Sequence, residues 1–164
     1  MSRNLENDFI IYLNMLHNIA AGENARRTQE MIRNIDGLIR YGNFRKGEIV
    51  PISEELLYTD ILIDIFRARF GGKFELVKEV SEDISGFYIP HFSVMAFVEN
   101  TLHHGLEPKE GSWRLELFIE RLDQTLSIRI VDNGVGFDSK AAGFERVDAG
   151  AQYGTVVDVL ARLK

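Results

Sequence analysis

Two polar residues interrupt an apolar helical pattern near the middle of the chain. Glu99 and Asn100 directly follow Phe97 and Val98, and a pair of histidines ending at His104 comes one turn later. Adjacent residues on a helix point about 100° apart, so at least one of the two polar side chains must leave the apolar face. An asparagine carbonyl oxygen suits Mg²⁺, which prefers oxygen ligands, and a neighbouring glutamate can orient or deprotonate a nucleophile. The competing interpretation is the solvent-facing edge of an amphipathic helix.

A second polar cluster, Asp132-Asn133-Gly134-Val135-Gly136, directly follows a predicted strand. Gly134 and Gly136 permit backbone angles and close approaches that side chains would block. Asp132, at the end of the strand, can accept a hydrogen bond from an exocyclic amine. Asp-Asn-Gly is also common turn chemistry, so a plain turn is the competing interpretation and the string alone is a moderate signal.

The elements that must position these clusters begin with three helices. Apolar residues at spacings of three and four predict them over residues 5–21, 24–41 and 53–70. The first helix is apolar over much of its circumference and therefore needs a partner surface. Ser53 is predicted to cap the third helix, with Glu54 and Glu55 beside the positive end of its dipole.

The rest of the chain alternates between strand and helix patterns. A helix is predicted from Pro90, as its first residue, to a stop at Gly105. Alternating apolar and polar residues predict strands on both sides of this helix, and a Gly-rich loop leads to a final helix. These elements are the strands 74–80, 114–120 and 126–131, a hairpin turn at Asp123-Gln124, the loop 133–154 and the helix 156–163.

Composition excludes several function classes. Of the 164 residues, 45 % are apolar and 27 % are charged, which is typical of a soluble globular protein. The 19 basic and 25 acidic side chains give a net charge of −6, which argues against a nucleic-acid binder because that function needs a basic face. There is no cysteine, so disulfides, thiol catalysis and zinc–thiolate sites are excluded. No stretch is long and apolar enough to cross a bilayer, and residues 1–7 lack the order of a signal peptide.

The two polar clusters together are much more specific than either one alone. An apolar helix with Glu-Asn, then a hairpin, then Asp-x-Gly-x-Gly resembles the GHKL superfamily of ATP-binding domains, and within it the LytS/YesM-like branch of bacterial sensor histidine kinases. The resemblance extends over nearly the whole chain. It rests on the segments 38–41 (LIRY), 52–56 (ISEEL), 69–71 (RFG), 89–90 (IP), 98–105 (VENTLHHG) and 132–137 (DNGVGF).

The resemblance implies an α+β fold, namely a GHKL-type two-layer α/β sandwich with helices on one face of a mixed sheet, preceded by a helical dimerisation hairpin. Residues 1–50 are expected to form the dimerisation and phosphoacceptor-like region, and residues 51–164 the ATP-binding domain without its last strands. The family reaction transfers the γ-phosphoryl group of ATP to a histidine on the dimerisation helices and then to a response regulator. A homodimer through the N-terminal helices, a response-regulator partner, no nucleic acid, and ATP with Mg²⁺ as cofactors are therefore expected. The expected location is the cytoplasm, as a free protein or as part of a membrane-anchored sensor.

Site residues follow from the resemblance, motif by motif. Asn100 matches the magnesium-binding asparagine of the family's N-box, and Glu99 matches the acidic residue before it. Asp132 matches the adenine-reading aspartate of the first Gly-rich box. The remaining matches are His104, expected near the phosphates, Gly134 and Gly136, expected to shape the pocket floor, and Gly154, the surviving glycine of the second Gly-rich box.

Two departures from the family bear on activity. Ile10 stands where the family carries its acceptor histidine, and isoleucine has no nucleophilic nitrogen; His17, seven residues later near the same helix face, is the alternative acceptor. In the second Gly-rich box, Val156 replaces a leucine and Asp158 an asparagine, and the added carboxylate would repel a triphosphate. The sequence thus predicts a divergent two-component sensor histidine kinase that cannot phosphorylate the usual position. The alternative is a catalytically inactive dimerisation or regulatory module that binds a partner kinase or response regulator.

Overall fold

The computed structural model describes residues 3–44, 47–136 and 155–162, with residues 3–8, 44 and 155–162 described through their backbone. The chain divides into two compact units, Met1–Lys46 and Gly47–Lys164. Within the described segments, no helix combines the length and the apolar character that spanning a membrane requires.

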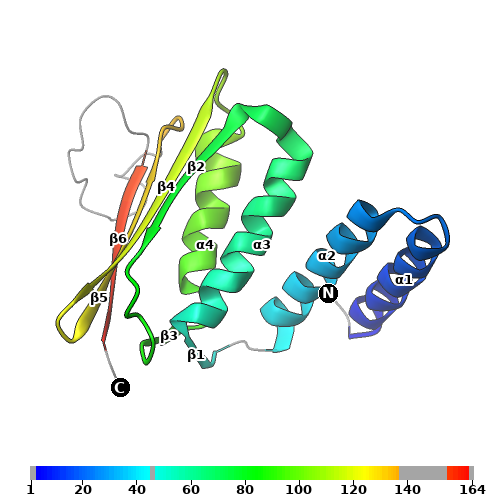
Figure 1. The fold of residues 1–164 in the computed structure, drawn as a ribbon, viewed down its shortest axis with the longest axis horizontal. Helices are drawn as coiled ribbons and strands as arrows, with labels where there is room; N and C mark the ends of the chain where they lie inside the picture. The colour runs from blue at the N-terminus through cyan, green and yellow to red at the C-terminus, as the bar shows by residue number, and fades with distance from the viewer. Residues whose placement is uncertain (1–2, 45–46, 137–154, 163–164) are drawn as a thin grey trace. The chain divides into compact units, whose positions relative to one another are not determined.

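The first unit is a helical hairpin of α1 (Arg3–Gly22) and α2 (Arg26–Phe44), drawn in blue and cyan in Figure 1. Its apolar core consists of Leu13 and Ala20 from α1 and Ile32 from α2. Both helices confirm the prediction from apolar spacing. Six other large apolar side chains of α1 are each between 46 % and 59 % exposed: Phe9, Ile11, Tyr12, Met15, Leu16 and Ile19. The hairpin as described leaves this side of α1 uncovered.

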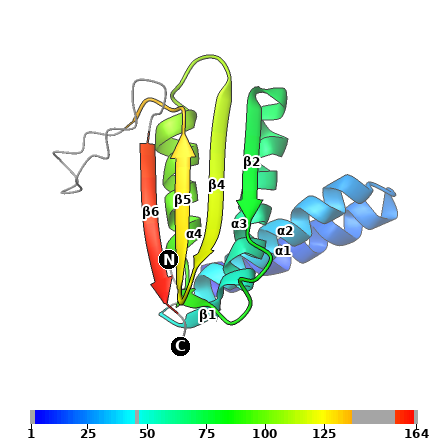
Figure 2. The same ribbon diagram turned by 60° about the vertical axis from the view of Figure 1, so that its left-hand side comes forward.

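The second unit is a two-layer sandwich. Its elements are β1 (Ile49–Pro51), α3 (Ile52–Phe70), a 3₁₀ turn (Gly71–Lys73), β2 (Phe74–Val80), β3 (Tyr88–Pro90), α4 (Ser93–Asn100), a π-helical turn (Thr101–Leu106), β4 (Trp113–Leu122), β5 (Thr125–Asp132) and β6 (Thr155–Arg162). The main sheet has the order β2–β4–β5–β6, with β2 parallel to β4 and the other pairs antiparallel. Figure 2 shows α3 and α4 behind this sheet. The predicted α+β class, with helices on one face of a mixed sheet, is confirmed.

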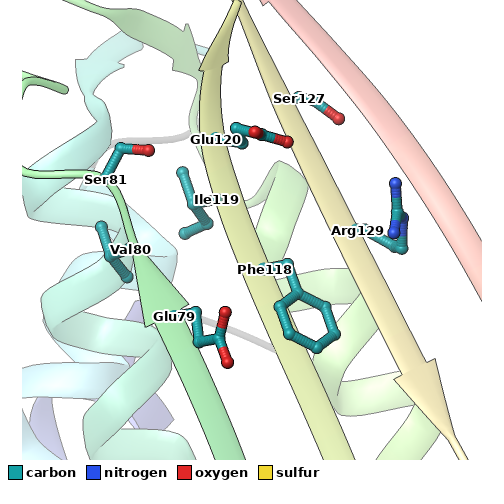
Figure 3. A pocket seen from close by; sticks show the side chains of 8 residues that line it. All are labelled: Glu79, Val80, Ser81, Phe118, Ile119, Glu120, Ser127 and Arg129. Carbon is teal, nitrogen blue, oxygen red and sulfur yellow. The ribbon is translucent and has the colours of Figure 1, made fainter.

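Alternating strand residues divide the sheet into a core face and an open face. The core residues of β4 and β5 that are buried beneath the helices are Trp113, Leu115, Leu117, Ile119, Leu126, Ile128 and Ile130. Side chains along a strand point to opposite faces in turn, so Phe118 and Arg129 lie on the open face, as Figure 3 shows. A groove on that face is lined by these two residues and by Glu79, among others. Asp132 continues the buried series of β5, so this groove lies on the other side of the sheet from it.

Three predicted helix boundaries are wrong, because contacts of the backbone with other segments, and not the local sequence, decide where these helices begin and end. α3 begins at Ile52, whose N–H donates to the Phe87 carbonyl (3.0 Å), and Ser53 is therefore inside the helix and is not its cap. Pro90 is the last residue of β3, paired with β1, and does not begin α4. Gly105 does not end the helical segment but lies inside the π-helical turn.

The last described segment is a strand and not the predicted helix. Residues 155–162 form β6, antiparallel to β5, with Thr155 opposite Asp132. Three of its eight residues are valines, which favour strands because a β-branched side chain is restricted in a helix. Pairing with β5 also satisfies backbone groups that an edge strand would leave unpaired. A short apolar run is compatible with either state, and sheet pairing decides between them.

Candidate functional site

The two helices of the second unit start close together because the short strands before them pair. α3 follows β1 directly, α4 follows β3 after two residues, and β1 and β3 are antiparallel neighbours. The His91 N–H also donates to the Glu48 carbonyl (2.9 Å), which extends this pairing by one bond. The first turn of α3 therefore lies at the N-terminal end of α4.

Glu55, in the first turn of α3, places a fully buried carboxylate at the N-terminal end of α4. Its Oε1 accepts hydrogen bonds from the N–H groups of Val94 and Met95, and its Oε2 accepts one from Phe92, all at 3.0 Å. Phe92 has φ of +68°, a conformation that bulky side chains rarely adopt. Glu55 thus satisfies the first backbone donors of α4 and holds a strained turn.

The opposite end of α4 carries the first polar cluster of the sequence. Glu99 is half-buried, and Asn100 and His104 are exposed. Throughout the described part of the chain, none of these three side chains has a hydrogen-bond or ion-pair partner. The π-helical turn begins directly after Asn100, and such wide turns are frequent at functional sites. These polar groups are available to a ligand.

Asp132, at the end of β5, is the buried member of the second polar cluster, with 1 % of its surface exposed. Its Oδ1 accepts a hydrogen bond from the Gly134 N–H (2.7 Å), and its Oδ2 accepts one from the Thr101 hydroxyl (3.4 Å). Thr101 is the first residue of the π-helical turn, so this carboxylate meets the segment that follows Glu99 and Asn100. The fold thus brings the two polar clusters of the sequence together.

Two glycines make this close approach possible. A Cβ atom on Gly134 would lie 2.2 Å from the Gly105 carbonyl oxygen, and a Cβ atom on Gly105 would lie 3.2 Å from Asp132 Oδ1. The Val135 N–H donates to the same Gly105 carbonyl (2.8 Å). Gly136 has φ of +73°, in the left-handed region that glycine favours. The need for glycine at position 134 comes from backbone packing.

An exposed charge cluster borders the π-helical turn. The Glu107 carboxylate accepts a hydrogen bond from Arg69 Nη2 and pairs with His103 Nδ1, both at 2.9 Å. The bond to His103, with a smaller contribution from Arg69, holds the pKa of Glu107 below its ordinary value. Among the described residues, no group of three His, Asp or Glu side chains is placed to hold a metal ion. A metal ion at the α4 site would take most of its ligands from a bound substrate and from water.

Comparison with known proteins finds similar sequences and a similar fold. No family model matches the chain. The chain is 28 % identical over 138 residues to the sensor histidine kinase YpdA of Escherichia coli (strain K12), which covers 84 % of this chain and 24 % of that protein. It is 30 % identical over 92 residues to the sensor protein LytS of Oceanobacillus iheyensis, which covers 56 % of this chain and 16 % of that protein. The chain is thus similar in sequence to LytS-like sensor histidine kinases. It spans about a quarter or less of the length of these two relatives.

A solved structure supports the fold of this LytS-like chain. The histidine kinase domain of a blue-light-activated histidine kinase from Erythrobacter litoralis EL346 matches 98 % of this chain and 94 % of that domain, with a TM-score of 0.52 and 10 % identity. At that identity the likeness concerns the fold alone. The two-layer sandwich therefore has the GHKL-type histidine kinase architecture that the sequence predicted.

The helical hairpin of this LytS-like chain contains one histidine near the expected acceptor position. Ile10 is half-buried, and His17 lies on the same side of α1 as the core residues Leu13 and Ala20. His17 Nε2 is buried and has no hydrogen-bond partner among the described residues. Burial makes Nε2 inaccessible to a phosphoryl donor, but His17 as a whole is half-buried, so the geometry counts against this one of the two ring nitrogens only.

Some site residues lie beyond the description, and others were missed in the sequence. Gly154 is outside the described residues, and Asp158 is described only through its backbone, opposite Arg129. Glu55 was predicted to face the dipole of its own helix, and its contact with α4 was missed because the partners are 37 to 40 residues away. No local signal in the sequence marks this contact, since the burial of Glu55 and of Thr59 one turn later is known only from the structure.

Proposed function

We propose that residues 47–164 bind Mg²⁺-ATP, and that the whole protein is a divergent sensor histidine kinase of a two-component system. One observation carries this proposal. The buried, hydrogen-bonded Asp132 carboxylate lies against the turn that directly follows Glu99 and Asn100, which have no partner among the described residues. A fixed acceptor suits recognition of a nucleobase, and unpaired polar groups suit recognition of phosphates and a metal ion.

Asp132 is the residue that we assign to the adenine base. A carboxylate offers about four lone-pair sites, so it can accept the exocyclic amine in addition to its bonds from Thr101 and Gly134. The hydrogen bonds from Thr101 and Gly134 to opposite oxygens of the Asp132 carboxylate fix the orientation of that group. A fixed acceptor loses little conformational entropy when the base binds.

Asn100 fits a magnesium ion that is held mainly by phosphate oxygens. Mg²⁺ in such sites takes one or two protein ligands and otherwise uses phosphates and water, and the Asn100 amide is exposed and unpartnered in the described structure. When bound, the ion supplies neutralisation of the phosphate charge. Glu99 orients or deprotonates the attacking nucleophile, and His104 and Gly154 are assigned to the phosphates.

The acceptor of the phosphoryl group is assigned to a histidine outside α1. Ile10 offers no nitrogen, and His17 has one of its two ring nitrogens, Nε2, buried in the hairpin, which leaves only Nδ1 for a phosphoryl donor. A histidine of a partner chain is therefore the proposed first acceptor, with a response regulator as the protein that receives the phosphate next.

The uncovered side of α1 fits a second copy of this chain. Phe9, Tyr12, Leu16 and Ile19 recur at spacings of three and four and form an apolar stripe. Two hairpins that pack through such stripes form a four-helix bundle. We therefore include homodimerisation through α1 in the proposed function.

The alternative is a regulatory module that binds a partner kinase or a response regulator without catalysis. Ile10 favours it, since the usual acceptor is missing. Asp158 favours it as well, because an added carboxylate in the second Gly-rich box would repel a triphosphate.

Calorimetric titration with a non-hydrolysable ATP analogue and Mg²⁺ tests the proposal. We expect saturable binding to the full chain and its loss in Asp132→Asn, because the amide puts a donor against the exocyclic amine. Asp123→Asn in the β4–β5 turn is the matched control, since Asp123 is exposed and asparagine tolerates its φ of +54°. Absence of binding in the unmodified chain would overturn the kinase proposal and favour the regulatory module.

A further inference from the structure

We propose that Glu55 is a positioning residue for the nucleotide site and acts on it through α4. The assignment rests on the proposed function, because it concerns the same site. Glu55 lies at the first turn of α4, whereas Glu99 and Asn100 are its last two residues. Its role is to set the position from which Asn100 reaches the magnesium ion and Glu99 reaches the attacking nucleophile.

The short, continuous helix α4 couples the position of its first turn to the position of its last residues. The helix has eight residues, which corresponds to about 12 Å along its axis. Its buried residues Val94, Met95 and Val98 pack in the core, and its helical hydrogen bonds fix the distance between its two ends. A shift in the first turn is therefore carried to Asn100 without being absorbed on the way.

The first turn of α4 depends on Glu55 because it contains a strained residue. Phe92 has φ of +68°, and a bulky residue keeps such a conformation only when its surroundings hold it there. The Glu55 carboxylate accepts the N–H of Phe92 with one oxygen and the N–H groups of Val94 and Met95 with the other. Its negative charge is also favourable at the positive end of the α4 dipole.

Glu55→Gln is the substitution that isolates this role. Glutamine has nearly the same shape, and its carbonyl oxygen can still accept the N–H groups of Val94 and Met95. Its NH₂ group then faces the Phe92 N–H, and two donors cannot bond to each other. The side-chain volume is kept while the hold on the strained turn is lost.

The test compares the affinity of a non-hydrolysable ATP analogue in Mg²⁺ with its affinity in EDTA, at a temperature where circular dichroism shows every variant folded. In the unmodified chain we expect Mg²⁺ to raise the affinity about tenfold, the effect of about 1.4 kcal/mol. In Glu55→Gln we expect this ratio to fall to about one, while the affinity in EDTA stays within about twofold. Glu110→Gln, which removes an exposed carboxylate, is expected to keep the full ratio.

A purely structural role for Glu55 would lower both affinities equally and keep the ratio, which overturns the proposal. A ratio of one in the unmodified chain overturns it too, although nucleotide binding would stand. Absence of any binding in the unmodified chain defeats the proposed function itself, and this assignment with it.

Phe92→Gly adds a second check, because glycine adopts positive φ without strain. In the Glu55→Gln background it is expected to restore at least half of the lost ratio, and a failure to restore it counts against the strained turn as the link.

Discussion

The two ends of α4 differ in how their polar groups are satisfied. At the N-terminal end, the buried Glu55 carboxylate accepts three backbone N–H groups, all at 3.0 Å. At the C-terminal end, Glu99 and Asn100 have no partner among the described residues. Both ends carry a glutamate, yet one is completely buried and the other is half-buried. The Glu55 carboxylate therefore serves to stabilise the helix, whereas the Glu99 carboxylate has no such structural task among the described residues.

The difference follows from what each end meets. The N-terminal end faces α3, and burying its free N–H groups without partners would cost about 1–3 kcal/mol for each group. The C-terminal end meets the loop after β5, where the backbone of Gly134 packs against the backbone of Gly105. The side chains of Glu99 and Asn100 find no partner there among the described residues. Satisfied groups stabilise the helix, whereas unpaired groups at a surface are what a ligand can use.

The largest effect on stability is expected for Gly134→Ala, which disturbs the backbone contact near the C-terminal end of α4. A Cβ atom there would lie 2.2 Å from the Gly105 carbonyl oxygen, and backbone cannot swing aside as a flexible side chain does. We expect a loss of at least about 3 kcal/mol in the free energy of unfolding, the upper end of overpacking costs. Urea unfolding followed through Trp113 fluorescence measures it.

Gly72→Ala is the matched control for that substitution. No atom lies within 4 Å of its added Cβ, so the unfolding midpoint is expected to change little. An unfolding free energy of Gly134→Ala equal to that of Gly72→Ala would show that the two segments do not approach as described.

The next effect sets the two glutamates against each other. Glu55→Ala is expected to lower the free energy of unfolding by about 3 kcal/mol, because buried backbone donors lose their acceptor. Glu99→Ala is expected to change it by no more than about 0.5 kcal/mol, as for other sites without partners. Thermal unfolding of both variants gives the comparison directly, and equal losses would refute the contrast between the two ends of α4.

The contrast between the two ends was only half visible in the sequence. The C-terminal end could be predicted because its signal is local: Glu99-Asn100 and the Asp132 cluster are contiguous strings with recognisable chemistry. The N-terminal end could not, since Glu55 acts on residues 37 to 40 positions away. Pro90 was misread for the same reason, because its role is to pair with β1. Local patterns identify elements and motifs, whereas sheet pairing and contacts between helices decide where those elements start.

The final segment also shows that local patterns are insufficient, here for the type of element and not for its boundaries. The apolar run at residues 156–163 predicted a helix, and the structure contains β6 from Thr155 to Arg162. Helix and strand patterns are hard to separate in a run this short. The choice depends on whether β5 offers a free edge, which is a property of the whole sheet.

A smaller effect is expected for Thr101→Val, which removes the hydroxyl beside Asp132 and keeps the side-chain shape. The bond from Thr101 Oγ1 to Asp132 Oδ2 is long, at 3.4 Å, so its loss is expected to cost about 1 kcal/mol of unfolding free energy. Urea unfolding checks this value, and Thr101→Ser should recover part of it. A variant more stable than the unmodified chain would mean that this contact does not help to fix Asp132.

The smallest effect concerns the exposed Glu107, beside the C-terminal end of α4. The His103 bond and the Arg69 pair hold the pKa of Glu107 below its ordinary value of 4.5. A depressed carboxyl pKa means that the stabilisation is fully present above the unfolded pKa and is lost as the pH falls through the folded pKa. The melting temperature of the unmodified chain should therefore exceed that of Glu107→Gln slightly at pH 6, and the two melting temperatures should converge as the pH is lowered below about 4.

Salt at 0.5 M should reduce the difference in melting temperature at pH 6, because exposed pairs are screened. A difference for Glu107→Gln that grows on acidification would give the opposite sign and would show that Glu107 is not held in its charged form by His103 and Arg69.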